Sequence, residues 1–109
     1  MTKVKFSRCD GKFVGVECEG HADYAEEGCD IVCAALSSVV QTAVLGLMQI
    51  VGVNVDYTVD EERGYLKALL PKGISQNQAH DADIILKTAY LGASDLYETF
   101  SDFISLEVE

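Results

Sequence analysis

The sequence predicts an α+β domain in which two long helices pack on a mainly antiparallel sheet, in the order β-β-α-β-β-α-β. Two short turns, Asp10-Gly11 and residues 61–64, each separate a pair of β-rich segments. Two longer segments, 31–51 and 76–103, carry helical patterns instead. Strand pairs joined by tight turns favour antiparallel pairing, with both helices packed on the sheet. A chain of 109 residues suits a single domain over residues 1–109.

The first hairpin joins residues 3–9 to residues 12–19. Asp10-Gly11 is a strong signal for a two-residue turn between them. In the second strand, alternation places Val14, Val16 and Cys18 on one face. The polar segment 20–28 that follows has no periodicity and is predicted to be a loop.

The first helix is expected from about Ile31 to Val51, with Asp30 as its cap and Gly52 at its end. No charged residue lies between Ile31 and Val55, a length that could span a bilayer. Four polar residues nevertheless share one side of the helix: Ser38, Gln41, Thr42 and Gln49. We therefore predict a buried helix of a soluble protein. Because it is apolar on nearly every side, we also expect a homodimer that covers part of it.

The second half of the chain repeats the hairpin-then-helix pattern. Residues 53–60 and 65–70 form the second hairpin, and Ser75 to Gln78 resembles a capping box that opens a helix to about Phe103. Its expected core stripe has three- and four-residue spacing: Ala82, Ile85, Ala89, Ala93, Leu96, Phe100 and Phe103. Residues 105–109 alternate well enough for a last edge strand.

Charge limits the choice of partner. The formal net charge is −10, and no Lys/Arg cluster could neutralise the phosphates of a nucleic acid. A negative field would speed encounter with a basic partner, although the acids could equally serve solubility alone. The N-terminal residues lack the apolar run of a signal peptide, so we expect a cytoplasmic protein with reduced cysteines.

Cys33 and His21 are the candidate catalytic residues. If the helix begins at Ile31, Cys33 lies in its first turn, where unpaired N–H groups and the helix dipole favour a thiolate. His21 could fold back as base and then acid, and the N–H groups of Cys33 and Ala34 could receive an oxyanion. The alternative is that Cys33 is a small residue of the hydrophobic core with no catalytic role. A single His–Cys spacing has little specificity and does not decide between the two.

A family resemblance adds to these observations. The segment GHADYAEEGCDIVCAALS closely resembles the signature of the ribosomal-processing cysteine proteases, the Prp family. That signature is a GHA element, a short variable loop that ends in glycine, and DIVCAAVS. The chain matches it at Gly20-His21-Ala22, Gly28, residues 30–35 and Ser37, and has Leu36 where valine is commoner.

The resemblance implies a homodimeric cysteine endopeptidase with Cys33 as nucleophile and His21 as base. Relatives in this family remove a short N-terminal extension from the basic ribosomal protein L twenty-seven, after a pair of phenylalanines. The loop from Gly20 to Gly28 would then be a mobile cover that orders with substrate. Tyr24 could line the phenylalanine pocket, or be an ordinary loop tyrosine. We expect neither a cofactor nor direct nucleic-acid or membrane binding.

Two residues near Cys33 have alternative roles. Asp30 could cap the helix through a backbone N–H, which we favour, or orient His21 as a third catalytic member. Ser37 lies one turn beyond Cys33, where it could touch the site or bond back to the Cys33 carbonyl, the reading that we slightly favour.

The remaining cysteines and the second histidine are assigned other roles. Cys29 lies four residues before Cys33, and the two thiols with both histidines could suggest a metal site, but their spacing resembles no common zinc pattern, so we expect no metal. We interpret Cys29 as an exposed loop thiol open to oxidation. Cys9 and Cys18 are interpreted as structural, and His80 as a solvated surface residue.

One function of another class stays open at this point. A non-catalytic, ribosome-associated module could bind a basic protein tail through its acidic surface, with Cys33 inert. Thiol redox chemistry is not favoured, because the chain has no C-x-x-C motif.

Overall fold

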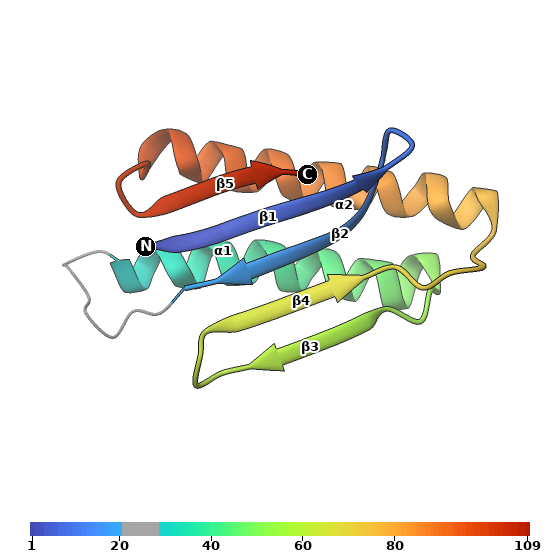
Figure 1. The fold of residues 1–109 in the computed structure, drawn as a ribbon, viewed down its shortest axis with the longest axis horizontal. Helices are drawn as coiled ribbons and strands as arrows, with labels where there is room; N and C mark the ends of the chain where they lie inside the picture. Colours follow the sequence, from blue (N-terminus) through green and yellow to red (C-terminus); the bar gives the residue numbers. More distant parts are fainter. Residues whose placement is uncertain (21–28) are drawn as a thin grey trace.

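The computed structural model describes residues 1–20 and 29–109, with side chains described from Ile31 onward in the second range. The elements come in the predicted order. They are β1 (Thr2–Cys9), β2 (Lys12–Glu19), α1 (Cys29–Gly46), the π-helical turn η1 (Leu47–Val51), β3 (Asp56–Asp60), β4 (Tyr65–Leu69), α2 (Gln76–Thr99) and β5 (Ile104–Val108). Figure 1 shows both long helices on the same face of the sheet.

The five strands form one sheet in the order β3-β4-β2-β1-β5. Three neighbouring pairs are antiparallel, and β5 pairs with β1 in parallel, from Thr2 opposite Ile104 to Phe6 opposite Val108. The mainly antiparallel prediction is therefore confirmed. The parallel pair places the first residues of β1 beside the turn between α2 and β5, where Thr2 N donates to Phe103 O over 2.8 Å.

The first hairpin turns at Asp10 and Gly11, whose φ angles of 53° and 80° are both left-handed, as a primed two-residue turn requires. The pairing register then slips, because Ser7 faces Gly15 while Arg8 faces Phe13. Val14 is the extra residue of this bulge. Phe13, rather than Val14 as predicted, is therefore buried with Val16 and Cys18.

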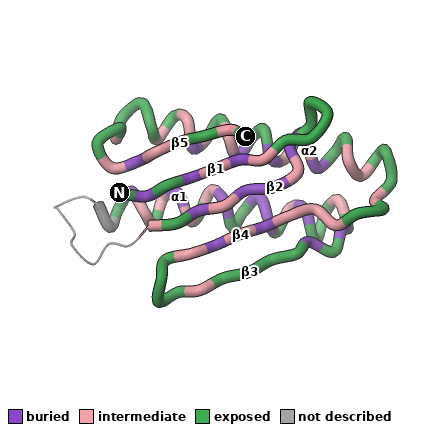
Figure 2. Tube along the Cα trace, viewed as in Figure 1, coloured by how far each residue is buried: buried purple, intermediate pink, exposed green. Residues whose placement is uncertain are grey.

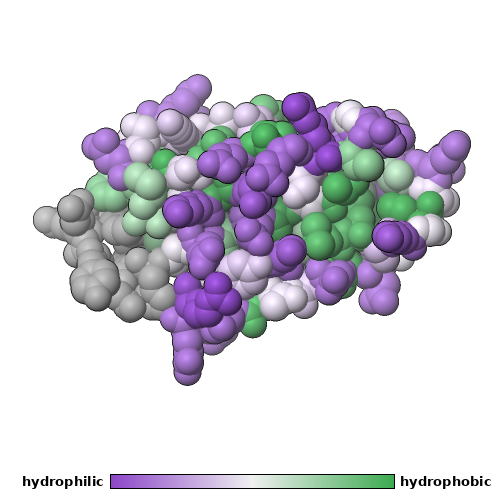
Figure 3. Space-filling view, in the orientation of Figure 1, coloured by the Kyte–Doolittle hydropathy of each residue, from purple (hydrophilic) through white to green (hydrophobic). Residues whose placement is uncertain are grey.

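The core lies between the sheet and the two helices (Figure 2). From α1 and η1 it receives a helical stripe: Val32, Leu36, Val40, Ala43, Val44 and Leu47. By length and composition, residues 31–51 could also cross a membrane, but a core helix passes the same test. The open face of the sheet is turned to the reader in Figure 3 and carries mostly hydrophilic side chains.

The helix ends follow their local sequence. Ser75 and Gln78 make both hydrogen bonds of the predicted capping box, each 3.0 Å long. The second helix ends at Thr99, four residues earlier than predicted, because Phe100 leaves helical geometry at φ −124° and ψ 40°. In its core stripe Leu86 is fully buried, and Ile85 is only partly buried. Gly52 closes η1 with a left-handed φ of 81°, as expected.

Candidate active site

The start of α1 differs from the prediction in a way that matters for chemistry. The helix begins at Cys29, so Asp30 is its second residue and does not occupy the capping position. Only the first few N–H groups of a helix lack an internal acceptor. Cys33 and Ala34, the fifth and sixth residues, come after them, so the structure does not support their N–H groups as oxyanion donors.

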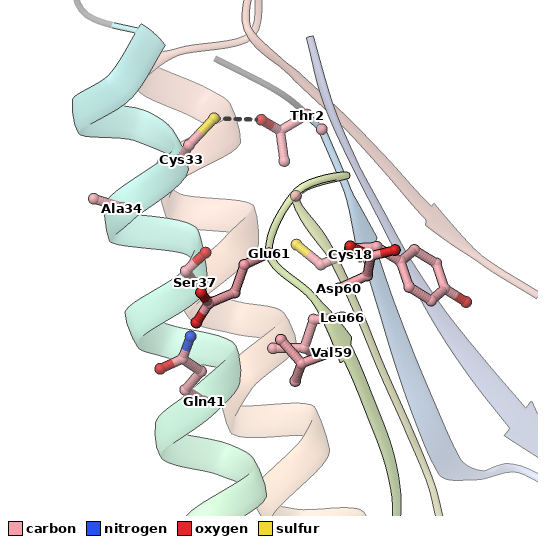
Figure 4. Close-up of a pocket in the computed structure, with 13 residues that line it drawn as sticks. Thr2, Cys18, Cys33, Ala34, Ser37, Gln41, Val59, Asp60, Glu61 and Leu66 are labelled. Carbon is pink, nitrogen blue, oxygen red and sulfur yellow. Dashed lines mark hydrogen bonds between the residues drawn. The ribbon is translucent and has the colours of Figure 1, made fainter. Parts of the chain in front are cut away.

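Cys33 contacts a residue that lies far outside the sequence motif. Its thiol is half-buried, and Sγ lies 2.8 Å from Oγ1 of Thr2, the second residue of the chain (Figure 4). Thr2 is itself buried, with 4% of its surface exposed. Strand β1 holds Thr2 beside β5, so the hydrogen bond between Thr2 and Cys33 connects α1 to the sheet.

Gly20 packs tightly against the same threonine. A Cβ atom built on Gly20 would lie 2.6 Å from Thr2 Cα and 2.8 Å from its Oγ1, so any larger residue there would force the backbone to shift. Gly20 N also donates to Gly64 O over 3.1 Å, which fixes the end of β2 against the β3–β4 turn. His21, the next residue, lies outside the described residues.

A cavity of about 400 Å³ opens beside Cys33, between α1 and the second hairpin. One wall is a row on α1: Cys33, Ala34, Ser37 and Gln41. The opposite wall comes from the second hairpin: Val59, Asp60, Glu61, Gly64, Tyr65 and Leu66. Thr2, Cys18 and Gly20 complete it. In Figure 4 the Glu61 side chain extends from the turn toward α1.

The charges at this cavity are negative. Asp60 and Glu61 line it, and none of its described lining residues is a lysine or arginine. Arg63, in the same turn, is paired with Glu19 at 3.1 Å and lies over the Tyr65 ring. The Tyr65 hydroxyl donates to Glu17 at 2.7 Å, and this hydrogen bond, followed by burial, raises the pKa of Tyr65. A cationic segment of a ligand therefore suits the hairpin side of the cavity.

Cys18 places a second thiol in the cavity, facing inward from β2 as predicted. Burial, and then the nearby Cys33, raise the pKa of Cys18 to about 11. Cys18 therefore stays protonated near neutral pH, and only a thiolate is an effective nucleophile. Of these two thiols, Cys33 is the better candidate.

The other predicted residues fall in several places. Ser37 lines the cavity, and in the described part of the chain no hydrogen bond joins its hydroxyl to the Cys33 carbonyl. Cys9 is exposed at the first turn, and His80 is exposed beside Asp81 at 3.1 Å. Tyr24, Gly28 and the Cys29 side chain lie outside the described residues.

Sequence reasoning missed three parts of this site. Thr2 belongs to no motif, and its contact with Cys33 spans 31 residues of sequence. The sequence assigns Asp60 only to the end of a strand and Glu61 only to the turn that follows it, and Gln41 only to a polar position on the first helix. A charged turn directly opposite a polar helix row could have suggested the cavity, but only once the sheet order was known.

Comparisons with known proteins show what this chain is similar to. The family model described as cysteine protease Prp matches residues 1–105. The ribosomal processing cysteine protease Prp of Staphylococcus aureus (strain Mu50) is 29% identical over 97 residues, 89% of this chain and 88% of the relative. The Bacillus subtilis protein of the same name is 25% identical over 93 residues, 85% of this chain and 83% of the relative.

Solved structures are similar over the whole fold. The crystal structure of the essential ribosomal processing protease Prp from S. aureus in complex with a substrate peptide has a TM-score of 0.87 and 26% identity, with both chains fully covered. The crystal structure of SMU.848 from Streptococcus mutans has a TM-score of 0.86 and 30% identity, covering 99% of this chain and 93% of the other.

Proposed function

The chain belongs to the Prp family of cysteine proteases, and from that premise we propose that it removes the N-terminal extension of ribosomal protein L twenty-seven through Cys33 and His21. The observation that carries the assignment is the position of Cys33, whose thiol faces a 400 Å³ cavity from the opening turns of α1. Family membership weighs against a non-catalytic ribosome-associated module, because the matching family is one of proteases.

In the proposed reaction, the Cys33 sulfur attacks the carbonyl carbon of the scissile peptide bond while His21 accepts the thiol proton. The tetrahedral intermediate collapses when His21 gives that proton to the departing amine. Water then attacks the Cys33 thioester and releases the second product. Gly20, which directly precedes His21, lines the same cavity as Cys33, and this supports the pairing.

The substrate assignment is supported by shape and charge. The cavity is at the lower end of the volumes typical of ligand sites, enough for a few side chains of an extended peptide. Its acidic hairpin wall complements a cationic segment near the scissile bond. An enzyme that carries a net charge of −10 would also attract a strongly basic ribosomal protein from a distance.

The test incubates the protein with the precursor of this ribosomal protein from the same organism and determines the new N-terminus by mass spectrometry. We expect cleavage after a pair of phenylalanines, and no cleavage by Cys33→Ala. Cys9→Ala is the matched control, because Cys9 is an exposed thiol at the first turn rather than a lining residue of the cavity. Equal cleavage by Cys33→Ala and the parent protein would refute the assignment of the nucleophile.

We also propose that the protease is a homodimer. The outer sides of the helices expose large apolar residues: Ile31, Leu45, Ile50, Ile84 and Leu91. A second copy that covered them would remove apolar surface from water. Light scattering coupled to gel filtration should give twice the chain mass of 11.8 kDa, and a monomer at micromolar concentration would contradict the proposal.

A cytoplasmic location completes the proposal. Three described cysteines, Cys9, Cys18 and Cys33, are free thiols, which suits a reducing compartment. Fractionation of the source cells should recover the protein with soluble cytoplasmic markers, and recovery with membranes would contradict this location.

A further inference from the structure

We propose that Thr2 is a positioning residue for Cys33, whose hydroxyl holds the thiol at the cavity and stabilises its anionic form. This inference rests on the proposed function, because it concerns the same nucleophile. It assigns a role to a position outside the family signature, supplied by the first strand rather than by the helix or the loop.

The burial of Thr2 makes the contact significant. Among the described residues, Thr2 is the one polar or charged side chain in the buried class, with 4% exposed. A buried hydroxyl without a partner costs free energy, and the hydrogen-bond partner of Thr2 Oγ1 is Cys33 Sγ at 2.8 Å. The buried hydroxyl is thus satisfied by the candidate nucleophile.

The direction of the effect follows from the chemistry of the two groups. A threonine hydroxyl can donate to sulfur or accept from it, whereas a neutral thiol is only a weak donor and a weak acceptor. A hydrogen bond to an ionised acceptor is about twice as strong as one between neutral groups. The same contact therefore stabilises the thiolate more than the thiol, and so favours the reactive form of Cys33.

The surroundings of Thr2 restrict how far it can move. Its backbone N–H is bound to Phe103 O, and it pairs with Ile104 of β5. On its other side Gly20 approaches so closely that an added Cβ would overlap Thr2. Thr2 thus lies between Cys33 and Gly20, the residue before His21. It connects the two halves of the sequence motif in space.

The experiment compares Thr2→Val with Thr2→Ser in the full chain. Valine keeps the branched shape without the hydroxyl, and serine keeps the hydroxyl. The rate of Cys33 alkylation by iodoacetamide is followed by mass spectrometry from pH 5 to pH 10, with the exposed Cys9 as internal reference. We expect Thr2→Val to slow Cys33 labelling about three- to tenfold at pH 6.5, the range for one lost hydrogen bond.

Thr2→Ser should recover the rate to within about twofold. An unchanged or faster rate of Cys33 labelling in Thr2→Val would overturn the inference. So would equal slowing in Thr2→Ser and Thr2→Val with equally lowered melting temperatures, because that result would indicate an effect of packing alone. If Thr2→Val does not fold, Thr2→Ala replaces it, with the same expected slowing of Cys33 labelling. In peptide cleavage the variant should lower kcat and leave KM nearly unchanged.

This readout separates the inference from the proposed function. If the parent protein does not cleave the ribosomal precursor, the proposed substrate fails, but the alkylation profiles still decide the role of Thr2. If the parent cleaves and Thr2→Val labels like the parent, the role of Thr2 fails and the protease assignment stands.

Discussion

Gly20→Ala should damage the site through packing rather than through any chemistry of its own. The new methyl group would lie 2.6 Å from Thr2 Cα, 2.8 Å from its Oγ1 and 2.9 Å from its Cβ. Ordinary contacts begin at 3.4 Å, so strand β1 or the end of β2 must shift by several tenths of an ångström. Thr2 Cα is a backbone atom of a residue paired with Ile104 of β5 and cannot rotate away.

Overpacking of this kind typically costs about 1–3 kcal/mol. For a domain of this size, each 1 kcal/mol lowers the melting temperature by roughly 4–8 °C. Because the methyl group also overlaps Thr2 Oγ1, we expect the contact with Cys33 to be displaced and Cys33 alkylation to slow several-fold. The assay is thermal unfolding by circular dichroism, followed by labelling kinetics at 25 °C.

Gly46→Ala is the matched control. Gly46 has helical angles, and the nearest atom to its added Cβ is the flexible end of Ile85, at 3.4 Å. In a helix this change should be neutral or stabilise by up to about 1 kcal/mol. If Gly20→Ala has the melting temperature and the Cys33 alkylation rate of the parent, the close packing of Gly20 on Thr2 does not hold Thr2 in contact with Cys33.

Three further results are expected. At pH 7, iodoacetamide should label Cys33 and leave Cys18 unreacted, because burial and then the nearby Cys33 raise the pKa of Cys18 to about 11; labelling of Cys18 first would contradict this. Asp83 accepts from Phe13 N at 2.7 Å and from Lys87 at 2.9 Å, and these bonds outweigh its partial burial and lower its pKa. Asp83→Ala should therefore cost about 1–2 kcal/mol in denaturant unfolding at pH 7. Since the pKa of Asp83 is lowered in the folded state, its contribution to stability is present above the ordinary pKa of 3.8 and is lost as the pH falls through the pKa of the folded state. A difference in unfolding free energy between Asp83→Ala and the parent that persisted at pH 2 would be evidence against the ion pair. Ser75→Ala should lower the free energy of unfolding by about 1 kcal/mol through loss of the capping box. An unchanged midpoint of denaturant unfolding would show that the cap contributes nothing.

Local signals accounted for most of the fold. Asp10-Gly11 placed the first turn correctly because both residues tolerate the left-handed angles that it needs. Ser75 and Gln78 located the start of α2 because the capping box acts within four residues. Both features depend on residues that are close together in sequence, so one sequence is enough to predict them.

Features set by distant contacts were not predictable in the same way. The pairing of β5 with β1 in parallel, the bulge at Val14 and the burial of Leu86 depend on how the sheet and helices meet. The start of α1 was misplaced by two residues, since Asp30 is as acceptable inside the first turn as before it.

The candidate site shows the same division. Cys33 stood out because it lies in a recognisable motif at a helix start. Thr2 did not, because nothing near position 2 of the sequence indicates that β1 carries it to within 2.8 Å of that thiol.

The most direct test of Cys33 as the nucleophile is covalent capture. A short peptide that ends in two phenylalanines and carries a chloromethyl ketone is added to the protein, and the adduct is mapped by mass spectrometry after digestion. We predict one peptide per chain, attached at Cys33 and absent in Cys33→Ser. Attachment at another residue, or cleavage of the ribosomal precursor by Cys33→Ser at the parental rate, would contradict this role for Cys33.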